Sequence, residues 1–495
     1  MRYVLTLVGS AVLVATGASA QVLPLPLVEA ARKTVVTNPE VQARWRGFRI
    51  ADAERGEARA GYLPQLDALA GAGRQNNRRP SGETGWYSYG SAALTLNQML
   101  FDGFFTRNEV QRLGHAKLVR YYELVEASET ATLEALRAYV DVIRYRELVE
   151  QAKLNYAEHK VTTSQIDERA GAGVGRRVDL EQAVGRLALA ESNLLTELAN
   201  LYDVTARYQR VVGEMPAANL PTLAEGIKLK GLPASLPEAM SLGLSNSPAL
   251  SAAIENVRAS EAGIAARKAA YVPRVDFRAS QNWDHNLLGE RGRSRDTSIG
   301  VVLSYNLYRG GADEARELKA VETKSQALDL QEKACRDLRQ NLASSYSESQ
   351  RLTEQLAFLD QHRLSSEKSR EAYRQQFDIG QRTLLDILDT QNEYFQASRA
   401  FINARYNQII AQARALASMG KLMTALEVSR PDMPSLAEAG RGTDGSNQAA
   451  ELCAGDLPPM VTVEQAKVGV DVTPRQRARP LPAGDQPGAA PAPRK

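Results

Sequence analysis

The stretch YLPQLDA at residues 62–68 returns as YVPRVDF at residues 271–277, and these two stretches decide the fold. In both copies a Tyr-x-Pro sequence follows an alanine-rich helical pattern and precedes an alternating one. Proline disfavours helix at the residue before it and has no N–H to donate, so a helix is predicted to end there. The alternation that follows has a period of two, which predicts a strand. Each copy therefore marks a junction between a helix and a strand.

The repetition extends beyond these junctions in both directions. Residues 27–67 align with residues 236–276 without a gap, and 11 of the 41 positions are identical. Downstream, LFDG at residues 100–103 matches LYRG at residues 307–310. A repeat of this length predicts a tandem duplication. Further matched pairs are Gly173 with Gly380, Asp179 with Asp386, and Gly213 with Gly420.

The two repeats, residues 21–215 and 216–430, are predicted to contain the same elements in the same order. Each has a helical segment, a hairpin of two strands, a long helix, a turn and a second helix, so the fold class is mainly α with a small β part. A helix of about 64 residues is roughly 95 Å long, and its narrow apolar stripe is typical of a coiled coil. The predicted ranges are helical segments 27–61 and 236–270, strands at about 64–76, 86–100, 273–283 and 297–307, long helices from 104 to about 167 and from 312 to about 377, and second helices 178–212 and 384–423.

The first twenty residues are typical of a secretory signal peptide. Arg2 supplies a positive start, residues 4–14 are largely apolar, and Ala18–Ala20 fits a signal peptidase site. The mature chain is expected to begin at Gln21, and without a Cys there no lipid anchor is expected. After the signal, no run of 18 or more apolar residues predicts a transmembrane helix. A location in a membrane would therefore have to use the strands.

The composition argues against several classes of function. Charged residues make up 24% of the chain and the net charge of +3 is spread along it, so nucleic-acid binding is unsupported. The run GAGVG at residues 171–175 follows a charged helix and not an apolar strand, so it is interpreted as a turn and not as a phosphate-binding loop. No metal site, cofactor or catalytic nucleophile is predicted, because His115, His159, His285 and His362 are scattered and no nucleophile stands beside a base.

The two cysteines, Cys335 and Cys453, lie far apart in segments of different character. They are not expected to make a disulfide framework, although an exported chain meets an oxidising compartment. Residues 431–495 are rich in Pro, Gly and Ala and are predicted to form a largely disordered tail.

This order of elements behind a signal peptide resembles the TolC family of outer-membrane channel-tunnels, from Leu27 to about Leu426. The resemblance is sharpest in FDIGQRTLLDILDTQN, residues 377–392, where the family typically has G-x-R-[ST]-x-x-D-x-L-D. Its counterpart in the first repeat is GVGRRVDL, residues 173–180. The resemblance implies that these two turns form the periplasmic tip of a long helical tunnel.

The resemblance also implies a homotrimer with a twelve-stranded barrel in the outer membrane of a Gram-negative bacterium. One chain supplies four strands, whereas known spanning barrels start at about eight, so self-association is required if these strands span the membrane. The implied partners are outer-membrane lipid, a periplasmic adaptor protein and an inner-membrane ABC or proton-driven transporter. The tips, at about 170–179 and 377–386, are expected to contact the adaptor through Gly173, Val174, Gly175, Gly380 and Gln381.

Asp386 and Asp389 are three residues apart on a helix, so both carboxylates project from nearly the same face. In a trimer each residue would appear three times, making two acidic rings that select cations. The alternative is a capping box in which Thr383 pairs with Asp386 and the acids complement the helix dipole. With the resemblance, the ring is the preferred interpretation for Asp389, and Asp386 serves both purposes.

Arg382 and Asp179 stand where similar proteins form ionic links that hold the tunnel entrance closed. The alternative is that both are solvated charges, since an exposed pair contributes only about 0 to 1 kcal/mol. Phe377 replaces a Tyr often found in the family and Val178 replaces a Thr, and both departures weaken the expected latch.

The sequence therefore predicts a passive export duct, opened when a transporter and its adaptor dock at the tips. Type I protein secretion is the preferred role, because many drug-efflux channels are lipidated, and small-molecule efflux is the alternative. A periplasmic coiled-coil scaffold without a pore is the other class, and it leaves the two amphipathic hairpins unexplained.

Overall fold

A computed structural model of the protein describes residues 23–78, 84–223, 226–440, 453, 455, 461 and 463–468. The chain divides into two compact units, Met1–Gly455 and Asp456–Lys495. The described part of the second unit contains one short helix, α12 (Val463–Lys467). The predicted signal peptide and most of the predicted tail lie outside the described residues.

The first unit contains both repeats, and the predicted fold class is confirmed: in the described residues helices predominate and there is one small sheet. In both repeats a hairpin leads into a helix of 67 residues, about 100 Å long. The first repeat consists of α1 (Leu25–Thr37), α2 (Pro39–Ala60), β1 (Gln65–Arg78), β2 (Thr84–Phe101), α3 (Phe105–Gly171) and α4 (Arg177–Val212). The second consists of α5 (Leu236–Asn246), α6 (Pro248–Lys268), β3 (Arg274–His285), β4 (Arg293–Ser304), α7 (Ala312–Asp378) and α8 (Leu384–Ser418). It also contains two short 3-10 turns, η1 (Ala269–Tyr271) and η2 (Leu287–Gly289).

The helical segment before each hairpin is two helices and not the one continuous helix predicted. In the first repeat the break is at Asn38, which is extended and whose side chain accepts a hydrogen bond from the N–H of Glu40. In the second repeat Ser247 takes the same role ahead of Pro248. Proline at the first position of a helix pushes the residue before it out of the helical region, so both breaks follow from the sequence.

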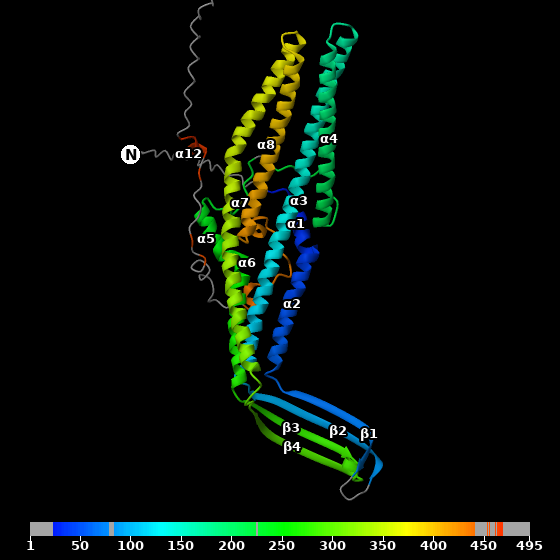
Figure 1. Ribbon diagram of the computed structural model, residues 1–495, viewed down its shortest axis with the longest axis vertical. Helices are drawn as coiled ribbons and strands as arrows, with labels where there is room; N and C mark the ends of the chain where they lie inside the picture. Colours follow the sequence, from blue (N-terminus) through cyan, green and yellow to red (C-terminus); the bar gives the residue numbers. More distant parts are fainter. Residues whose placement is uncertain are drawn as a thin grey trace, which may run out of the picture. The chain divides into compact units, whose positions relative to one another are not determined.

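The four strands form one antiparallel sheet in the order β1-β2-β3-β4 (Figure 1). Hydrogen-bonded partners across the sheet lie on one face, because side chains alternate along each strand. One row is Leu66, Leu96, Ala279 and Ile299, and the next row is Asp67, Thr95, Ser280 and Ser298. The sheet therefore has an apolar face and a polar face. Among the described strands, the two outer ones, β1 and β4, each have only one neighbour.

The last strand is displaced relative to its prediction. β4 spans Arg293–Ser304, whereas the alternating pattern had suggested about 297–307. Tyr305 and Leu307 continue the apolar alternation and are exposed by 50% and 88%, but they belong to the connection that leads to α7. Gly310 and Gly311, both with positive φ, complete that connection.

The helices pack around α3, which contacts α1, α2, α4, α6 and α8, while α7 contacts α8, α6 and α5. In Figure 1 the α3–α4 and α7–α8 turns lie at the end of the helices away from the sheet. The largest fully buried side chains include Tyr139 of α3 and Tyr406 of α8. None of the helices within the described ranges is long and apolar enough to cross a membrane.

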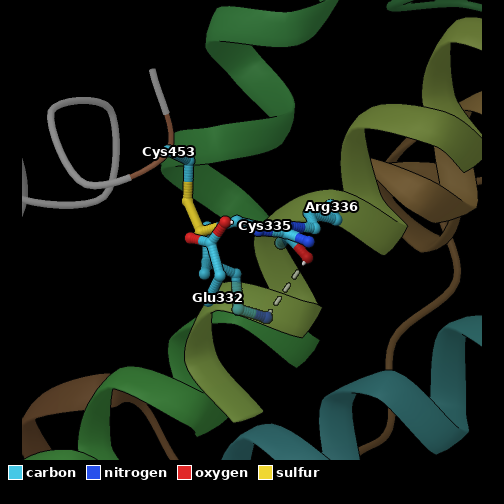
Figure 2. The surroundings of a disulfide bond; sticks show 6 residues. Glu332, Cys335, Arg336 and Cys453 are labelled. Atoms are coloured by element: carbon cyan, nitrogen blue, oxygen red, sulfur yellow. Dashed lines mark hydrogen bonds and ion pairs between the residues drawn. A yellow bond between two sulfur atoms is a disulfide. The ribbon is translucent and has the colours of Figure 1, made fainter. Parts of the chain in front are cut away.

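After α8 the chain forms two short helices, α9 (Leu422–Ala425) and α10 (Leu436–Ala439). Farther on, Cys453 is disulfide-bonded to Cys335 of α7, with their Cα atoms 5.4 Å apart (Figure 2). The two cysteines were not expected to make a disulfide framework, and the structure nevertheless joins them in a disulfide. Sequence separation concealed the pairing, because the two cysteines are 118 residues apart.

Candidate functional site

The turn between α3 and α4 is closed by a helix C-capping motif. The N–H groups of Gly173 and Val174 donate to the carbonyls of Ala170 and Arg169, each at 3.1 Å, which is the Schellman pattern. Gly173 has a φ of 77°. At Gly175 a Cβ would lie 2.9 Å from the backbone nitrogen of Ala170, so the two chain segments touch there. Both glycines are therefore required by the shape of the turn.

The turn between α7 and α8 has the same geometry. Gly380 donates to the carbonyl of Phe377 at 2.9 Å, and Gln381 donates to the carbonyl of Gln376 at 2.8 Å. Gly380 has a φ of 77°, the same value as Gly173. The internal repeat thus extends to the hydrogen bonds of the two turns, which supports the matching of Gly173 with Gly380.

A small apolar cluster lies directly behind the two turns and joins them. Phe377 is 6% exposed within it, and the guanidinium of Arg169 lies 5.0 Å from its ring centroid. Phe377 therefore contributes to packing between the two repeats. The cluster consists of Ile166, Ala183, Phe377, Leu384, Ile387 and Leu388, with Leu180 against it.

Asp386 forms the capping box that was one of its two interpretations. Its carboxylate accepts hydrogen bonds from the N–H and the hydroxyl of Thr383 at 3.1 and 2.8 Å, and its own N–H donates to that hydroxyl. These two hydrogen bonds to Thr383 lower the pKa of Asp386. Asp386 is therefore engaged in starting α8, while its carboxylate stays exposed to solvent.

Asp389 is also engaged, by a contact that the sequence did not suggest. Its carboxylate lies 2.7 Å from Nη2 of Arg186 on α4. The side chain of Asp389 is nevertheless 59% exposed. The negative charge at this position is thus partly compensated from the other repeat.

Arg382 and Asp179 are not brought together within one chain. Arg382 donates to the side-chain oxygen of Gln376 at 2.9 Å, and its guanidinium lies 4.3 Å from the ring centroid of Tyr373. In the described part of the chain these two residues form no ion pair. A link between them would have to join two copies of the chain.

Arginine–carboxylate pairs hold the α3–α4 hairpin against the α7–α8 hairpin. Three of them join residues that are 202 to 212 positions apart, close to the offset between the repeats. The sequence could have suggested these pairs from that spacing. Equivalent residues of two repeats that pack side by side lie at similar distances from the two turns. The pairs are Arg370 with Glu158 at 2.6 Å, Arg186 with Asp389 at 2.7 Å, Arg399 with Glu197 at 2.6 Å, and Arg405 with Glu147 at 2.5 Å.

A buried polar layer lies between α3 and α8 near these pairs. Gln391 donates to the hydroxyl of Thr162 at 3.2 Å. His159 is 3% exposed, and burial, with a smaller effect of Arg186, lowers its pKa to about 4. The imidazole is therefore neutral at ordinary pH.

The comparison with known families identifies this arrangement. The sequence profile of the outer membrane efflux protein family matches residues 31–214 and 239–421, which correspond to the two repeats. The chain belongs to this family. As a member of the outer membrane efflux protein family, it is a channel protein of the outer membrane of a Gram-negative bacterium.

Three characterised members of the outer membrane efflux protein family are similar along most of their length. The outer membrane efflux protein BepC of Brucella suis is 27% identical over 84% of this chain and 90% of its own. Outer membrane protein TolC of Escherichia coli is 24% identical over 89% of this chain and 93% of its own. The alkaline protease secretion protein AprF of Pseudomonas aeruginosa is 24% identical over 79% and 83%.

Solved structures of outer-membrane channels share the fold. The CmeC channel of Campylobacter jejuni has a TM-score of 0.73 at 15% identity, covering 81% of this chain and 86% of its own. VceC of Vibrio cholerae has a TM-score of 0.71 at 18% identity, covering 80% and 96%. The resemblance to channel-tunnels of this family is therefore confirmed for the fold.

Proposed function

We propose that three copies of the chain form the outer-membrane duct of a tripartite export system. The observation that carries this proposal is the sheet with one apolar face and two unpaired edges, on β1 and β4. A lipid-facing edge leaves backbone groups without partners, so a spanning sheet has to close. Joining β4 of one copy to β1 of the next gives a ring of twelve strands from three copies, within the range of known barrels.

The helices offer apolar surface for the same association. Exposed apolar side chains lie on α4 and α7, two long helices in which few residues are buried in one chain. Such surface on a long coiled coil is typical of contacts with neighbouring helices. The exposed residues include Val184, Leu189, Leu195 and Tyr202 of α4 and Leu318, Leu328 and Phe358 of α7.

The tips are proposed to bind the periplasmic adaptor, and an inner-membrane ABC or proton-driven transporter supplies the energy. Both turns present apolar side chains to solvent, which suits docking to a partner of similar shape. These lie beside Gly173, Gly175, Gly380 and Gln381, whose backbones form the turns. The exposed fractions are 81% for Val174, 66% for Val178, 69% for Ile379 and 52% for Leu385.

Leu385→Asp is expected to stop export without closing the channel. A carboxylate at this tip would have to be desolvated in the adaptor interface, so export should fall about tenfold or more while conductance is unchanged. Leu154→Asp on α3, exposed by 58%, is the matched control and should export like the wild type. Equal export by the two variants would contradict docking at the tips.

The cargo is proposed to be protein delivered by a type I transporter, as the name of the relative AprF suggests for that protein. Efflux of small molecules is the second candidate, because the name of the toluene efflux pump outer membrane protein TtgI of Pseudomonas putida gives such a cargo for that protein. Measuring both secreted protein and dye accumulation in cells that carry wild type or Leu385→Asp separates the two cargo classes.

Asp389 and Asp386 are proposed to form two acidic rings at the entrance. Arg186 is proposed to reduce the negative charge of the Asp389 ring. In planar bilayers the purified trimer should conduct, and a trivalent cation on the helical side should block it. Asp389→Ala should weaken this block about tenfold, whereas Arg186→Ala should strengthen it by leaving Asp389 unpaired. Block that is unchanged in both variants would contradict the rings.

The same recordings test two further points. Arg382→Ser should raise the conductance if Arg382 and Asp179 link neighbouring copies in the closed state, and unchanged conductance would refute this latch. Channels absent from a well-folded trimer would instead favour a periplasmic scaffold without a pore.

A further inference from the structure

Three arginines in the half of the sheet farthest from the helices lie on its apolar face. Side chains alternate between the two faces along a strand, so Arg293 and Arg295 share a face of β4 with Ile299. For the same reason Arg74 shares a face of β1 with Leu66. The pairing of β1 with β2 and of β3 with β4 runs without a shift of register, so the alternation is maintained up to these positions. All three arginines are exposed.

This end of the sheet is remote from every connection to a helix. β1 and β3 each begin after a helical segment, and β2 and β4 each lead into one, so these connections are all at the opposite end. In Figure 1 the far ends of the strands point away from the helices. If the sheet spans the outer membrane and the helices lie in the periplasm, the three arginines lie at the level of the outer leaflet.

Tryptophan side chains accompany the arginines on this face. Trp283 of β3 is the partner of Arg295 across the strands and is 40% exposed. Trp86 of β2 lies on the same face and is 66% exposed. Tryptophan is typical of the boundary between the hydrocarbon region and the headgroups. The arginines therefore lie where headgroups are expected, and a cationic side chain costs little at that depth.

The acidic residues of the strands lie on the other face. None of the four described strands contains a glutamate, and all of their aspartates lie on the polar face. Solvated charges of both signs would not need to be sorted in this way, because water reaches them equally on either face. Arginines without a carboxylate on their own face of the described strands point to an anionic ligand on the lipid side. The aspartates are Asp67, Asp276, Asp284 and Asp296.

We propose that Arg293 and Arg295 of one copy, together with Arg74 of the next copy, bind phosphate groups of the glycolipid in the outer leaflet. This inference rests on the proposed ring of three copies, in which β4 of one copy joins β1 of the next. That joint places the far ends of β4 and β1 side by side, with their apolar faces on the same side. Arginine suits the ligand because its guanidinium donates two parallel hydrogen bonds to phosphate oxygens. The ring would carry three such sites, one at each joint.

The position of the site favours the glycolipid over other anions. The outer leaflet of a Gram-negative outer membrane consists mainly of a glycolipid with phosphate groups on its sugars, whereas glycerophospholipids form the inner leaflet. Basic side chains near a membrane surface attract anionic headgroups, and this attraction falls off within a Debye length. A phosphorylated sugar of the outer leaflet reaches the arginines at their own level, whereas the headgroups of the inner leaflet lie at the opposite end of the strands.

Lipid binding to the full-length trimer in non-ionic detergent tests this inference. The probe is an acylated glucosamine disaccharide with two phosphates, and the matched probe is the same lipid without phosphates. Native mass spectrometry of the wild type should show binding of the phosphorylated probe that is about tenfold tighter or more. Arg293→Gln/Arg295→Gln should lose this preference, and Arg74→Gln should reduce it.

Two variants control for charge and for folding. Arg278→Gln removes the same charge from the polar face of β3 and should bind both probes like the wild type. Arg293→Lys/Arg295→Lys keeps both charges and should bind the phosphorylated probe more tightly than the glutamine variant does.

Four results would overturn the site. Two come from the lipid probes: equal binding of both by the wild type, or an equal loss in Arg278→Gln and Arg293→Gln/Arg295→Gln. The others are equally tight binding of phosphatidylglycerol and displacement of the glycolipid by an excess of inorganic phosphate, because either would show a site for phosphate from any source.

Bilayer conductance separates this inference from the proposed duct. The arginines lie on the face opposite the polar one, so the wild type and Arg293→Gln/Arg295→Gln should conduct alike. A conducting wild-type trimer with no preference for the phosphorylated probe would overturn the lipid site and leave the duct intact. A wild type without channels that still preferred this probe through Arg293 and Arg295 would count against the duct and support the site on β4.

Discussion

Val301→Arg is expected to prevent stable assembly in the outer membrane. Val301 lies on the apolar face of β4 opposite Phe277 and is 64% exposed in one chain. If this face meets lipid, a cationic side chain there costs about 2 kcal/mol per copy, and the trimer carries three copies. The yield of trimer extracted by detergent from outer membranes should therefore fall at least tenfold.

The adjacent valine provides the control. Val302 points to the polar face and is paired across the strands with Asp276, so Val302→Arg places a cation opposite a carboxylate. The change of residue and the strand are the same in both variants, and only the face differs. Similar trimer yields from Val301→Arg and Val302→Arg would contradict a sheet that presents its apolar face to lipid.

Arg399→Leu is expected to destabilise the helical part more than any other single ion-pair substitution. Glu197, its partner on α4, has a side chain only 2% exposed, and its remaining contact is with the amide of Asn200 at 3.3 Å. Removing the arginine leaves a buried charge without compensation, which costs about 3 to 5 kcal/mol. The free energy of unfolding, measured in denaturant by circular dichroism, should fall by that amount.

Two further variants test whether that loss of stability comes from the unpaired charge or from lost packing. Arg399→Leu/Glu197→Leu removes both charges and should recover most of the stability, because an apolar pair of similar size replaces the buried ion pair at little cost. Lys153→Leu breaks an exposed pair with Glu150 and should cost about 0 to 1 kcal/mol. A single and a double variant of equal stability would show that packing around Arg399, and not its charge, holds the hairpins together.

The parts of the fold that were predictable have local causes. The Tyr-x-Pro junctions, the alternation of Phe277 with Arg278, and the glycines of the two turns act through backbone preferences of a few neighbouring residues. Errors arose where a local pattern continued past the element, as Tyr305 and Leu307 do beyond β4. The break at Asn38 was missed because helical composition on both sides concealed the effect of the following proline.

The candidate site was predictable for its position but not for its contacts. Gly380 is suited to the left-handed position that ends a helix, and Thr383 is suited to the position that caps the start of the next one. The turn and the capping box could therefore be predicted from the sequence. The pairing of Asp389 with Arg186 depends on how two repeats lie side by side, and the pairing of Cys335 with Cys453 depends on where the chain returns. Neither pairing can be predicted from the residues next to it in the sequence.

The unpaired edges of β1 and β4 also have a consequence for how the proposed trimer would be built. Joining two copies pairs one edge of each, so a dimer still has two free edges. The third copy forms two joints at once and closes the ring, so this step pairs four edges whereas the first step pairs only two. Assembly should therefore be strongly cooperative, with a steep dependence on concentration and almost no dimer at equilibrium.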